Sequence, residues 1–261
     1  MLRVAPRVET LKALAHRDTA DGSPAEIPVF LARPHGAGGE RRPGLLLIQE
    51  IFGVNPHIQD VAQRFAAMGY VVAAPDILYR TGHWQAYGYD QTAAVRPFFT
   101  SLQPEQVVGD LRAALDFLVA QPDVDPDRLG VVGYCFGGRM SLLAAERFNH
   151  QLKAAAVYYG GGIVAENPAA PIHHVGDIRC PVVAFFGALD QNIPREHVET
   201  LEQVLGAAGV QHEVFYYPQA QHGFFCDARA SYNPQAAQDA WHRTLWFFAS
   251  HLGPVPAVNW D

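Results

Sequence analysis

The sequence predicts an α/β fold with a mostly parallel central sheet flanked by helices on both faces. Short, continuous aliphatic runs alternate along the chain with longer segments in which apolar residues recur at helical spacing. Strands buried on both faces have such continuous runs, and their alternation with helices is typical of parallel sheets. A length of 261 residues with 49% hydrophobic content suffices for one large core, so we expect a single domain over residues 1–261.

The expected elements follow one another without a repeat or a low-complexity tract. The first strand is closed by a proline and a glycine-rich loop, and Gly69 ends the first helix, as is common at helix C-termini. Strands are expected at 27–32, 44–49, 70–74, 129–134, 154–159, 182–187 and 213–217. Helices are expected at 58–68, 105–120, 136–147, 195–208 and 235–251. Such sheets bind ligands at the carboxyl ends of their strands, so functional residues are expected there.

Residues 76–103 form the longest stretch without clear periodicity, and they are rich in tyrosine, phenylalanine and tryptophan. Loops of this length inside a compact domain are uncommon and are often functional. We therefore expect a long loop here that caps an active site.

The net charge of −7 argues against nucleic acids as partners, because an acidic chain repels their phosphates. The longest aliphatic runs are far too short to span a bilayer, and residues 1–17 lack the apolar core of a signal peptide. The odd number of cysteines, 3, is more typical of a reducing compartment than of a disulfide scaffold. We expect a cytoplasmic protein without nucleic-acid or membrane partners, and both a monomer and a homodimer remain open.

No metal site is expected. The 12 histidines are scattered along the chain. The adjacent His173 and His174 would point apart in an extended segment, and no third ligand stands at metal-binding spacing from them.

Residues 133–138, with the sequence Gly-Tyr-Cys-Phe-Gly-Gly, are the strongest indication of chemistry. The pattern Gly-x-nucleophile-x-Gly is typical of a nucleophile elbow, here with Cys135 as the nucleophile. The residues two before and two after a nucleophile on such a sharp turn approach each other closely, which favours glycine. The start of a helix also favours a thiolate. The alternatives are a buried cysteine beside a glycine-rich turn and a nucleotide-binding loop, but the chain has neither a Gly-Lys-Ser/Thr ending nor a Gly-x-Gly-x-x-Gly pattern.

An acid and a base should follow this nucleophile, in that order. Asp190 lies just past the strand expected at 182–187 and before a helix, where a carboxylate can reach a histidine. His222 lies past the last expected strand and before the final helix. The alternatives are an N-cap or turn aspartate and a surface histidine. The order and the spacing favour a catalytic triad of Cys135, Asp190 and His222.

On these residues the chain resembles the dienelactone hydrolase family of α/β-hydrolases over nearly its whole length. The resemblance rests on 49–53 (Gln-Glu-Ile-Phe-Gly), 69–70 (Gly-Tyr), 74–76 (Ala-Pro-Asp), the cysteine elbow, Asp190 and 222–224 (His-Gly-Phe). Serine esterases would carry serine at the elbow. The resemblance implies an α/β-hydrolase fold and a hydrolase that needs no cofactor.

The resemblance also implies roles for single residues. The nucleophile, the general base and acid, and the orienting carboxylate would be Cys135, His222 and Asp190. Glu50 resembles the family glutamate that contacts the resting thiol, and a buried carboxylate beside a thiol can accept its proton. The alternative for Glu50 is an ordinary loop glutamate. The backbone N–H groups of Ile51 and Phe136 would form the oxyanion hole.

Members of the family use arginines to hold a substrate carboxylate, and here the resemblance is incomplete. Arg80 lies close to the place of one such arginine, although it could equally be a solvated surface residue. Four residues after the histidine, where well-known members carry another arginine, this chain has Cys226. Two arginines would bind a carboxylate far better than one. Apolar contacts to the substrate are expected from Tyr79, Trp84 and Phe224.

The sequence therefore predicts a hydrolase of small esters or lactones. A thiolate suits activated esters and suits amides poorly, because the tetrahedral intermediate would expel thiolate before amine. Two alternatives remain: a broad-specificity carboxylesterase or thioesterase, and, from another class, a catalytically silent binding protein of the same fold. A complete triad together with Glu50 argues against the silent protein, since binding requires none of these together.

Overall fold

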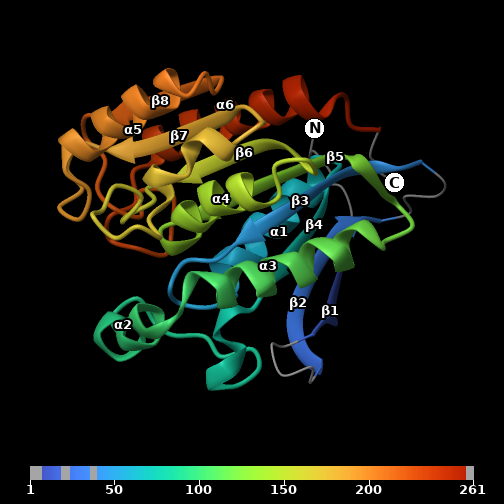
Figure 1. Ribbon diagram of the computed structural model, residues 1–261. Coiled ribbons are helices and arrows are strands. Elements are labelled where there is room, and N and C mark those ends of the chain that lie inside the picture. Colours follow the sequence, from blue (N-terminus) through green and yellow to red (C-terminus); the bar gives the residue numbers. More distant parts are fainter. Residues whose placement is uncertain (1–7, 19–23, 36–39, 257–261) are drawn as a thin grey trace, which may run out of the picture. The chain divides into compact units, whose positions relative to one another are not determined.

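The computed structural model describes residues 8–18, 24–35 and 40–256 (Figure 1). These residues form two compact units: one contains the chain up to Leu129 together with the stretch from Gly253, and the other is Gly130–Leu252. No helix in the described ranges is long and apolar enough to cross a membrane.

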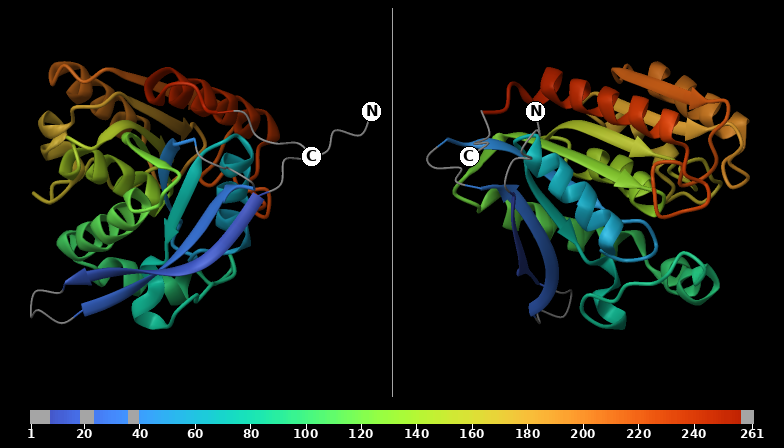
Figure 2. Two further views of the ribbon diagram at one scale, coloured as in Figure 1. Left: turned by 90° about the vertical axis from the view of Figure 1, so that its right-hand side faces the viewer. Right: turned by 180° about the vertical axis from the view of Figure 1, so that it is seen from behind.

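The first unit is a twisted sheet with a helix on each face. Its strands follow the order β1-β2-β4-β3, in which β1/β2 and β2/β4 are antiparallel and β3/β4 is parallel. These strands are β1 (Val8–Asp18), β2 (Pro24–Pro34), β3 (Arg42–Ile48) and β4 (Val71–Pro75). Helix α1 (Pro56–Ala67) and helix α3 (Pro104–Val119) lie on opposite sides of these strands (Figure 2).

Strand β1 was not expected from the sequence. A strand alternates its side chains between two faces, and Leu11 and Leu14, three residues apart, therefore belong to opposite faces. Both are exposed, at 56% and 40%. The segment thus lacks the alternation that marks a half-buried strand, and its pairing with β2 defines it instead.

The long loop expected at 76–103 contains two helical segments, so that expectation was wrong in part. A 3₁₀ turn, η1 (Ile77–Thr81), begins at Asp76, whose carboxylate accepts a hydrogen bond from the N–H of Leu78. Helix α2 (Thr92–Ser101) buries only Val95 and Phe99. Two buried positions four residues apart give too weak a periodic signal for a helix to be recognised. The role of this segment as a cap stays a prediction.

The second unit is built on parallel strands with helices on both faces. Strand β5 (Val124–Tyr134) begins in the first unit and ends in the second, where the order is β5-β6-β7-β8. The further strands are β6 (Leu152–Tyr158), β7 (Val182–Gly187) and β8 (His212–Tyr217), and the pairs β6/β7 and β7/β8 are parallel. Helices α4 (Phe136–Arg147) and α5 (Arg195–Ala207) lie on one face of the strands, and α6 (Pro234–Leu252) covers the other (Figure 2). Two 3₁₀ turns, η2 (Pro171–His173) and η3 (Val175–Asp177), follow β6.

The predicted fold class is confirmed: the strands form a mostly parallel 8-stranded sheet, and the helices flank its two faces. The core of the second unit is strongly aromatic. The hydroxyl of Tyr158 lies 2.6 Å from that of Thr244 and 3.0 Å from the carbonyl oxygen of Ala240, which ties β6 to α6. A buried tyrosine hydroxyl needs such partners, because an unsatisfied polar group inside a core is costly.

Candidate active site

The turn between β5 and α4 holds Cys135 in a strained backbone conformation. The strand ends at Tyr134, the helix begins at Phe136, and Cys135 between them has φ 56° and ψ −115°. A non-glycine residue at positive φ costs on the order of 1–3 kcal/mol and persists only where its surroundings impose it. Here the N–H of Cys135 donates to the carbonyl oxygen of Tyr158 on the neighbouring strand, at 3.0 Å. The thiol is thus fixed at the carboxyl end of β5.

Glycines make this turn sterically feasible. A Cβ atom at Gly133 would collide with the carbonyl oxygen of Gly137, and a Cβ atom at Gly138 would collide with that of Tyr158. Both obstacles are backbone atoms, which cannot move aside without moving a strand or a helix. The close approach expected from the sequence pattern is therefore present.

Asp190 and His222 come from the turns that follow β7 and β8. The Asp190 side chain is fully buried, and its Oδ1 accepts the N–H of Asn192 at 2.8 Å. Its Oδ2 lies 2.7 Å from Nδ1 of His222, and Nε2 of the same ring lies 3.0 Å from Sγ of Cys135. The three residues singled out from the sequence thus lie in one hydrogen-bonded chain within the second unit.

The charges in this hydrogen-bonded group of three residues favour a charged imidazole on His222. Burial by itself would lower the pKa of His222, but a negative charge on Cys135 and the hydrogen-bonded carboxylate of Asp190 outweigh burial and raise the pKa to about 10. The ordinary pKa of histidine is about 6.5. A charged imidazole beside the sulfur favours the thiolate, which is the reactive form of a cysteine nucleophile.

Two residues around the histidine show how the aromatic core supports it. Tyr159 has φ 36°, and its ring centre lies 5.2 Å from that of His222 in an edge-on contact. Phe224, expected to contact the substrate, is fully buried, and its ring packs edge-on against Tyr159 and Tyr217. Phe224 therefore lies in the core beneath the histidine turn. The sequence analysis passed over Tyr159, whose positive φ has no sequence signal.

The sequence analysis also passed over Arg139, which lies one helical turn after Cys135 on α4. Its backbone N–H donates to the carbonyl oxygen of Cys135 at 3.3 Å, and its guanidinium carbon lies 5.6 Å from the centre of the Phe136 ring. Residues four apart on a helix are neighbours, so this spacing from the elbow was a usable signal.

The remaining predicted residues belong to the first unit. Glu50 is fully buried just after β3, so it is not an ordinary loop glutamate on the surface, and Ile51 follows it in a turn. Arg80 makes two hydrogen bonds to the buried carboxylate of Asp110, at 2.6 and 3.0 Å, and stacks on the ring of Tyr79 with 4.4 Å between the guanidinium carbon and the ring centre. The backbone N–H of Trp84 donates a hydrogen bond to the Asp76 carboxylate at 2.8 Å. The predicted contacts of these residues with a substrate stay predictions.

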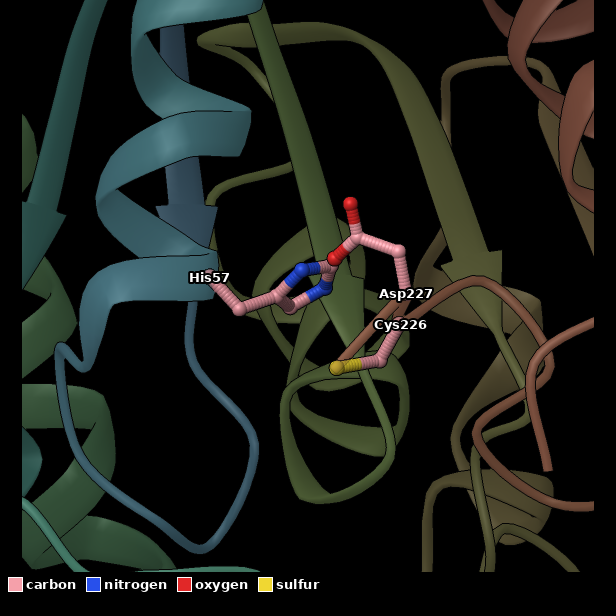
Figure 3. A group of neighbouring side chains, drawn as sticks. All are labelled: His57, Cys226 and Asp227. Carbon is pink, nitrogen blue, oxygen red and sulfur yellow. The ribbon is translucent and has the colours of Figure 1, made fainter. Parts of the chain in front are cut away.

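The loop after His222 carries Cys226, where the resemblance places an arginine in well-known members. Cys226 is fully buried and Asp227 is exposed, and their side chains leave the loop in different directions (Figure 3). His57 of α1, also drawn in Figure 3, belongs to the first unit. Neither unit by itself contains three neighbouring metal-ligand atoms among its described residues.

The same loop places an arginine close to the histidine turn. A Cβ atom at Gly223 would collide with the guanidinium of Arg229, so this guanidinium lies against the residue that follows His222. The loop thus places the cationic side chain of Arg229 near the histidine turn, three residues after Cys226 in the sequence.

Comparisons with known proteins agree with the fold and the motifs. The model of the "Dienelactone hydrolase family" matches residues 27–252. A Synechocystis protein named "Putative carboxymethylenebutenolidase" is 39% identical over 232 residues, which are 87% of this chain and 93% of that protein. The "Carboxymethylenebutenolidase" of Rhodococcus opacus is 32% identical over 214 residues, covering 80% of this chain and 81% of that one.

Solved structures extend the likeness to three dimensions. A crystal structure named "Putative Dienelactone Hydrolase", from Klebsiella pneumoniae, matches with a TM-score of 0.81 at 33% identity and covers 94% of this chain and 100% of that chain. The match spans both units and the elbow. The chain belongs to the dienelactone hydrolase family and is a carboxylic ester hydrolase with the α/β-hydrolase fold.

Proposed function

We propose that the protein cleaves small esters or lactones through a covalent acyl-enzyme on Cys135. One observation carries the proposal: the hydrogen-bonded chain from Asp190 through His222 to the sulfur of Cys135, with distances of 2.7 and 3.0 Å. A nucleophile, a base within hydrogen-bond reach and a third group that orients the base are the parts that acyl transfer requires.

In the proposed mechanism the thiolate of Cys135 attacks the substrate carbonyl carbon. Negative charge then develops on the carbonyl oxygen, where the N–H of Phe136 and the positive end of α4 stabilise it. We propose the N–H of Ile51 as the second donor. When the intermediate collapses, the C–O bond to the leaving group breaks and the imidazolium of His222 supplies the proton that the alkoxide takes up. A thioester remains on Cys135.

Deacylation reverses the roles. Neutral His222 accepts a proton from water, the resulting hydroxide attacks the thioester carbon, and the thiolate leaves as His222 becomes charged again. Asp190 holds the ring in the tautomer and orientation that both steps need, because its carboxylate accepts the hydrogen bond from Nδ1. The sulfur leaves readily, which suits esters and lactones better than amides.

The proposed substrates are small esters or lactones. Relatives named carboxymethylenebutenolidase support a lactone among them. We further propose that the buried carboxylate of Glu50 tunes the reactivity of the Cys135 thiol. Glu50→Gln keeps the shape of the side chain and removes its charge, and we expect turnover to fall about tenfold to a thousandfold, the scale of a positioned proton acceptor.

We also infer a cytoplasmic location, because all three cysteines are free and free thiols persist in reducing compartments. The resemblance places Arg80 near a family arginine that holds a substrate carboxylate, which would favour substrates that carry one. That guanidinium is engaged with Asp110, so binding a substrate there would require it to share its donors. The oligomeric state stays open between monomer and homodimer.

The covalent mechanism is tested by the Cys135→Ala variant with a neutral activated aryl ester. We expect hydrolysis to fall to the level of the uncatalysed reaction. Cys180→Ala removes the same atom from a buried position in the same unit, and there kcat should stay within about twofold, since that thiol touches none of the proposed machinery. Wild-type turnover in Cys135→Ala would rule out the mechanism.

A further inference from the structure

Arg139 is a largely buried guanidinium without an acidic partner. Within the described ranges its side chain makes neither a hydrogen bond nor an ion pair, and its Nε is buried without any partner. Two other arginines of the same unit are paired with carboxylates: Arg195 with Glu199 and Arg243 with Asp239, at 2.7 and 2.6 Å. Arg139 therefore carries a cationic group that no carboxylate of the described residues contacts.

The position of this cation is fixed by its surroundings. The backbone of Arg139 is held by the first turn of α4, through the hydrogen bond to Cys135. The guanidinium rests over the Phe136 ring on one side. On another side it meets the glycine-rich turn after β6, where a Cβ atom at Gly162 would come within 2.9 Å of Nη1. Glycine at 162 thus leaves the room that the guanidinium occupies.

Such a group is expensive to keep. Burial lowers the pKa of Arg139, and a negative charge on Cys135 opposes this shift. Taking a cation out of water without a partner costs free energy that a packed apolar side chain would not cost. The charge can be offset by an anion that comes to it, and it lies on the first turn of the helix that follows Cys135, close enough for the two charges to interact.

The charge of Cys135 cannot be that anion throughout a catalytic cycle. Once the sulfur has attacked, it is a neutral thioester, and the guanidinium is again without a partner. A guanidinium with unoccupied nitrogens is suited to a planar carboxylate, which it can bind through two parallel hydrogen bonds. The partner that arrives together with the acyl group is the substrate itself.

We propose that Arg139 is a specificity-determining residue that binds a carboxylate of the substrate next to the carbon attacked by Cys135. The inference rests on the proposed function, because it assumes that Cys135 is the nucleophile. It assigns recognition of an acidic substrate to the helix that carries the nucleophile, and it does not require Arg80 to leave Asp110.

Two alkylating reagents of nearly equal size test this directly. Iodoacetate carries a carboxylate next to the carbon that the thiolate attacks, and iodoacetamide carries a neutral amide there. The rate constant for alkylation of Cys135 by each reagent is measured by mass spectrometry of the Cys135 peptide. We compare the wild type, Arg139→Met, Arg139→Lys and Arg195→Met, the last of which removes one exposed charge from the same unit.

The expected result is a change in the ratio of the two rate constants. The iodoacetate-to-iodoacetamide ratio should fall about tenfold or more in Arg139→Met, the scale of one charge-assisted hydrogen bond. It should fall less in Arg139→Lys and stay at the wild-type value in Arg195→Met. The rate with iodoacetamide shows in each variant that the thiol is still reactive.

Other outcomes overturn the proposal in distinguishable ways. If Arg139→Met slows both reagents by the same factor, Arg139 supports the thiolate rather than binding an anion, and the inference fails while the proposed function stands. If wild-type Cys135 reacts with neither reagent, Cys135 is not the nucleophile, and both fail.

Discussion

The imidazole Nε2 of His222 lies 3.0 Å from the sulfur of Cys135, although 87 positions separate the two residues in the chain. Cys135 comes directly after β5 and His222 lies in the turn that follows β8, and the carboxyl ends of parallel strands meet at one edge of a sheet. Asp190 follows a third strand, β7, and holds the far side of the same ring. The topology thus brings together the three residues proposed as nucleophile, base and orienting acid.

The Asp190→Asn variant tests the orienting role of this carboxylate. An amide can donate to Nδ1 and so favour the wrong tautomer of His222, and it removes one of the charges that raise the pKa of His222. We expect kcat on an activated ester to fall about a hundredfold or more. Asp239→Asn removes a carboxylate of the same unit that binds Tyr217 and Arg243 instead, and its kcat should remain near that of the wild type. Equal effects in the two variants would contradict the assignment.

The Gly133→Ala variant tests the steric argument for the elbow. The added methyl group would collide with the backbone of Gly137, so strand or helix must shift. We expect a loss of stability of about 2 kcal/mol or more, and loss of activity in whatever protein folds. Gly176→Ala adds the same methyl group where nothing lies within 4 Å and should leave both unchanged. Chemical denaturation and an ester assay report the two quantities, and a stable, active Gly133→Ala protein would refute the argument.

The sequence predicted most of the fold because most of its elements follow one strong pattern. The strand 182–187 and the helix 136–147 have the expected bounds, and in both an uninterrupted apolar or amphipathic segment is closed by glycine, proline or a charged residue. The three residues of the expected triad were accessible for a related reason. Each lies at or within a few residues of the end of a recognisable strand, so its place at the sheet edge follows from topology alone.

Features that depend on tertiary contacts could not be predicted from the sequence. Strand β1 is defined by its partner strand rather than by its own pattern. The engagement of Arg80 with Asp110 joins residues 30 positions apart that no local pattern connects. Nothing in the sequence indicates the positive φ of Tyr159, or that the Nε of Arg139 is buried without a partner among the described residues.

Glu146 makes the stability of the protein depend on pH. Both of its carboxylate oxygens are buried on α4 without a hydrogen-bond partner in the described ranges. Burial raises its pKa from the usual 4.5 to about 8; Arg147 opposes this shift and Asp177 adds to it. Between these two values the native state holds a proton that the unfolded state has lost, so the contribution of Glu146 to stability falls as the pH rises from 4.5 to 8.

The Glu146→Gln variant removes this titration. Its stability should be close to that of the wild type near pH 4.5 and should exceed it above pH 8 by up to about 5 kcal/mol, since one pKa unit corresponds to about 1.4 kcal/mol. Urea denaturation at several pH values measures the difference. Glu196→Gln, at an exposed position on α5, serves as the control and should show no such trend. A difference between Glu146→Gln and the wild type that does not vary with pH would show that the carboxyl group is not buried in neutral form.

We expect the loss of Arg80 to lower the stability of the folded protein, because its guanidinium is paired with Asp110. The carboxylate of Asp110 is fully buried, and Arg80→Met would leave it without its cation. Removing one partner of a buried pair costs about 3–5 kcal/mol. Arg112→Met breaks a long, exposed pair with Asp116 and should cost less than about 1 kcal/mol. Thermal unfolding measures both, and a second change, Asp110→Asn, should restore much of the stability of Arg80→Met. An undiminished Tm in Arg80→Met alone would show that the pair contributes nothing.

The central claim is that the substrate's acyl group passes through a thioester on Cys135. Acid quenching within the first turnover of an activated ester, followed by peptide mapping and mass spectrometry, detects this intermediate directly. The claim predicts the mass of the acyl group on the peptide that contains Cys135, its loss on treatment with hydroxylamine, and its absence from Cys180 and Cys226. Turnover at the wild-type rate with no acyl group on Cys135 at any quench time, in an assay sensitive enough to detect its steady-state level, would contradict it.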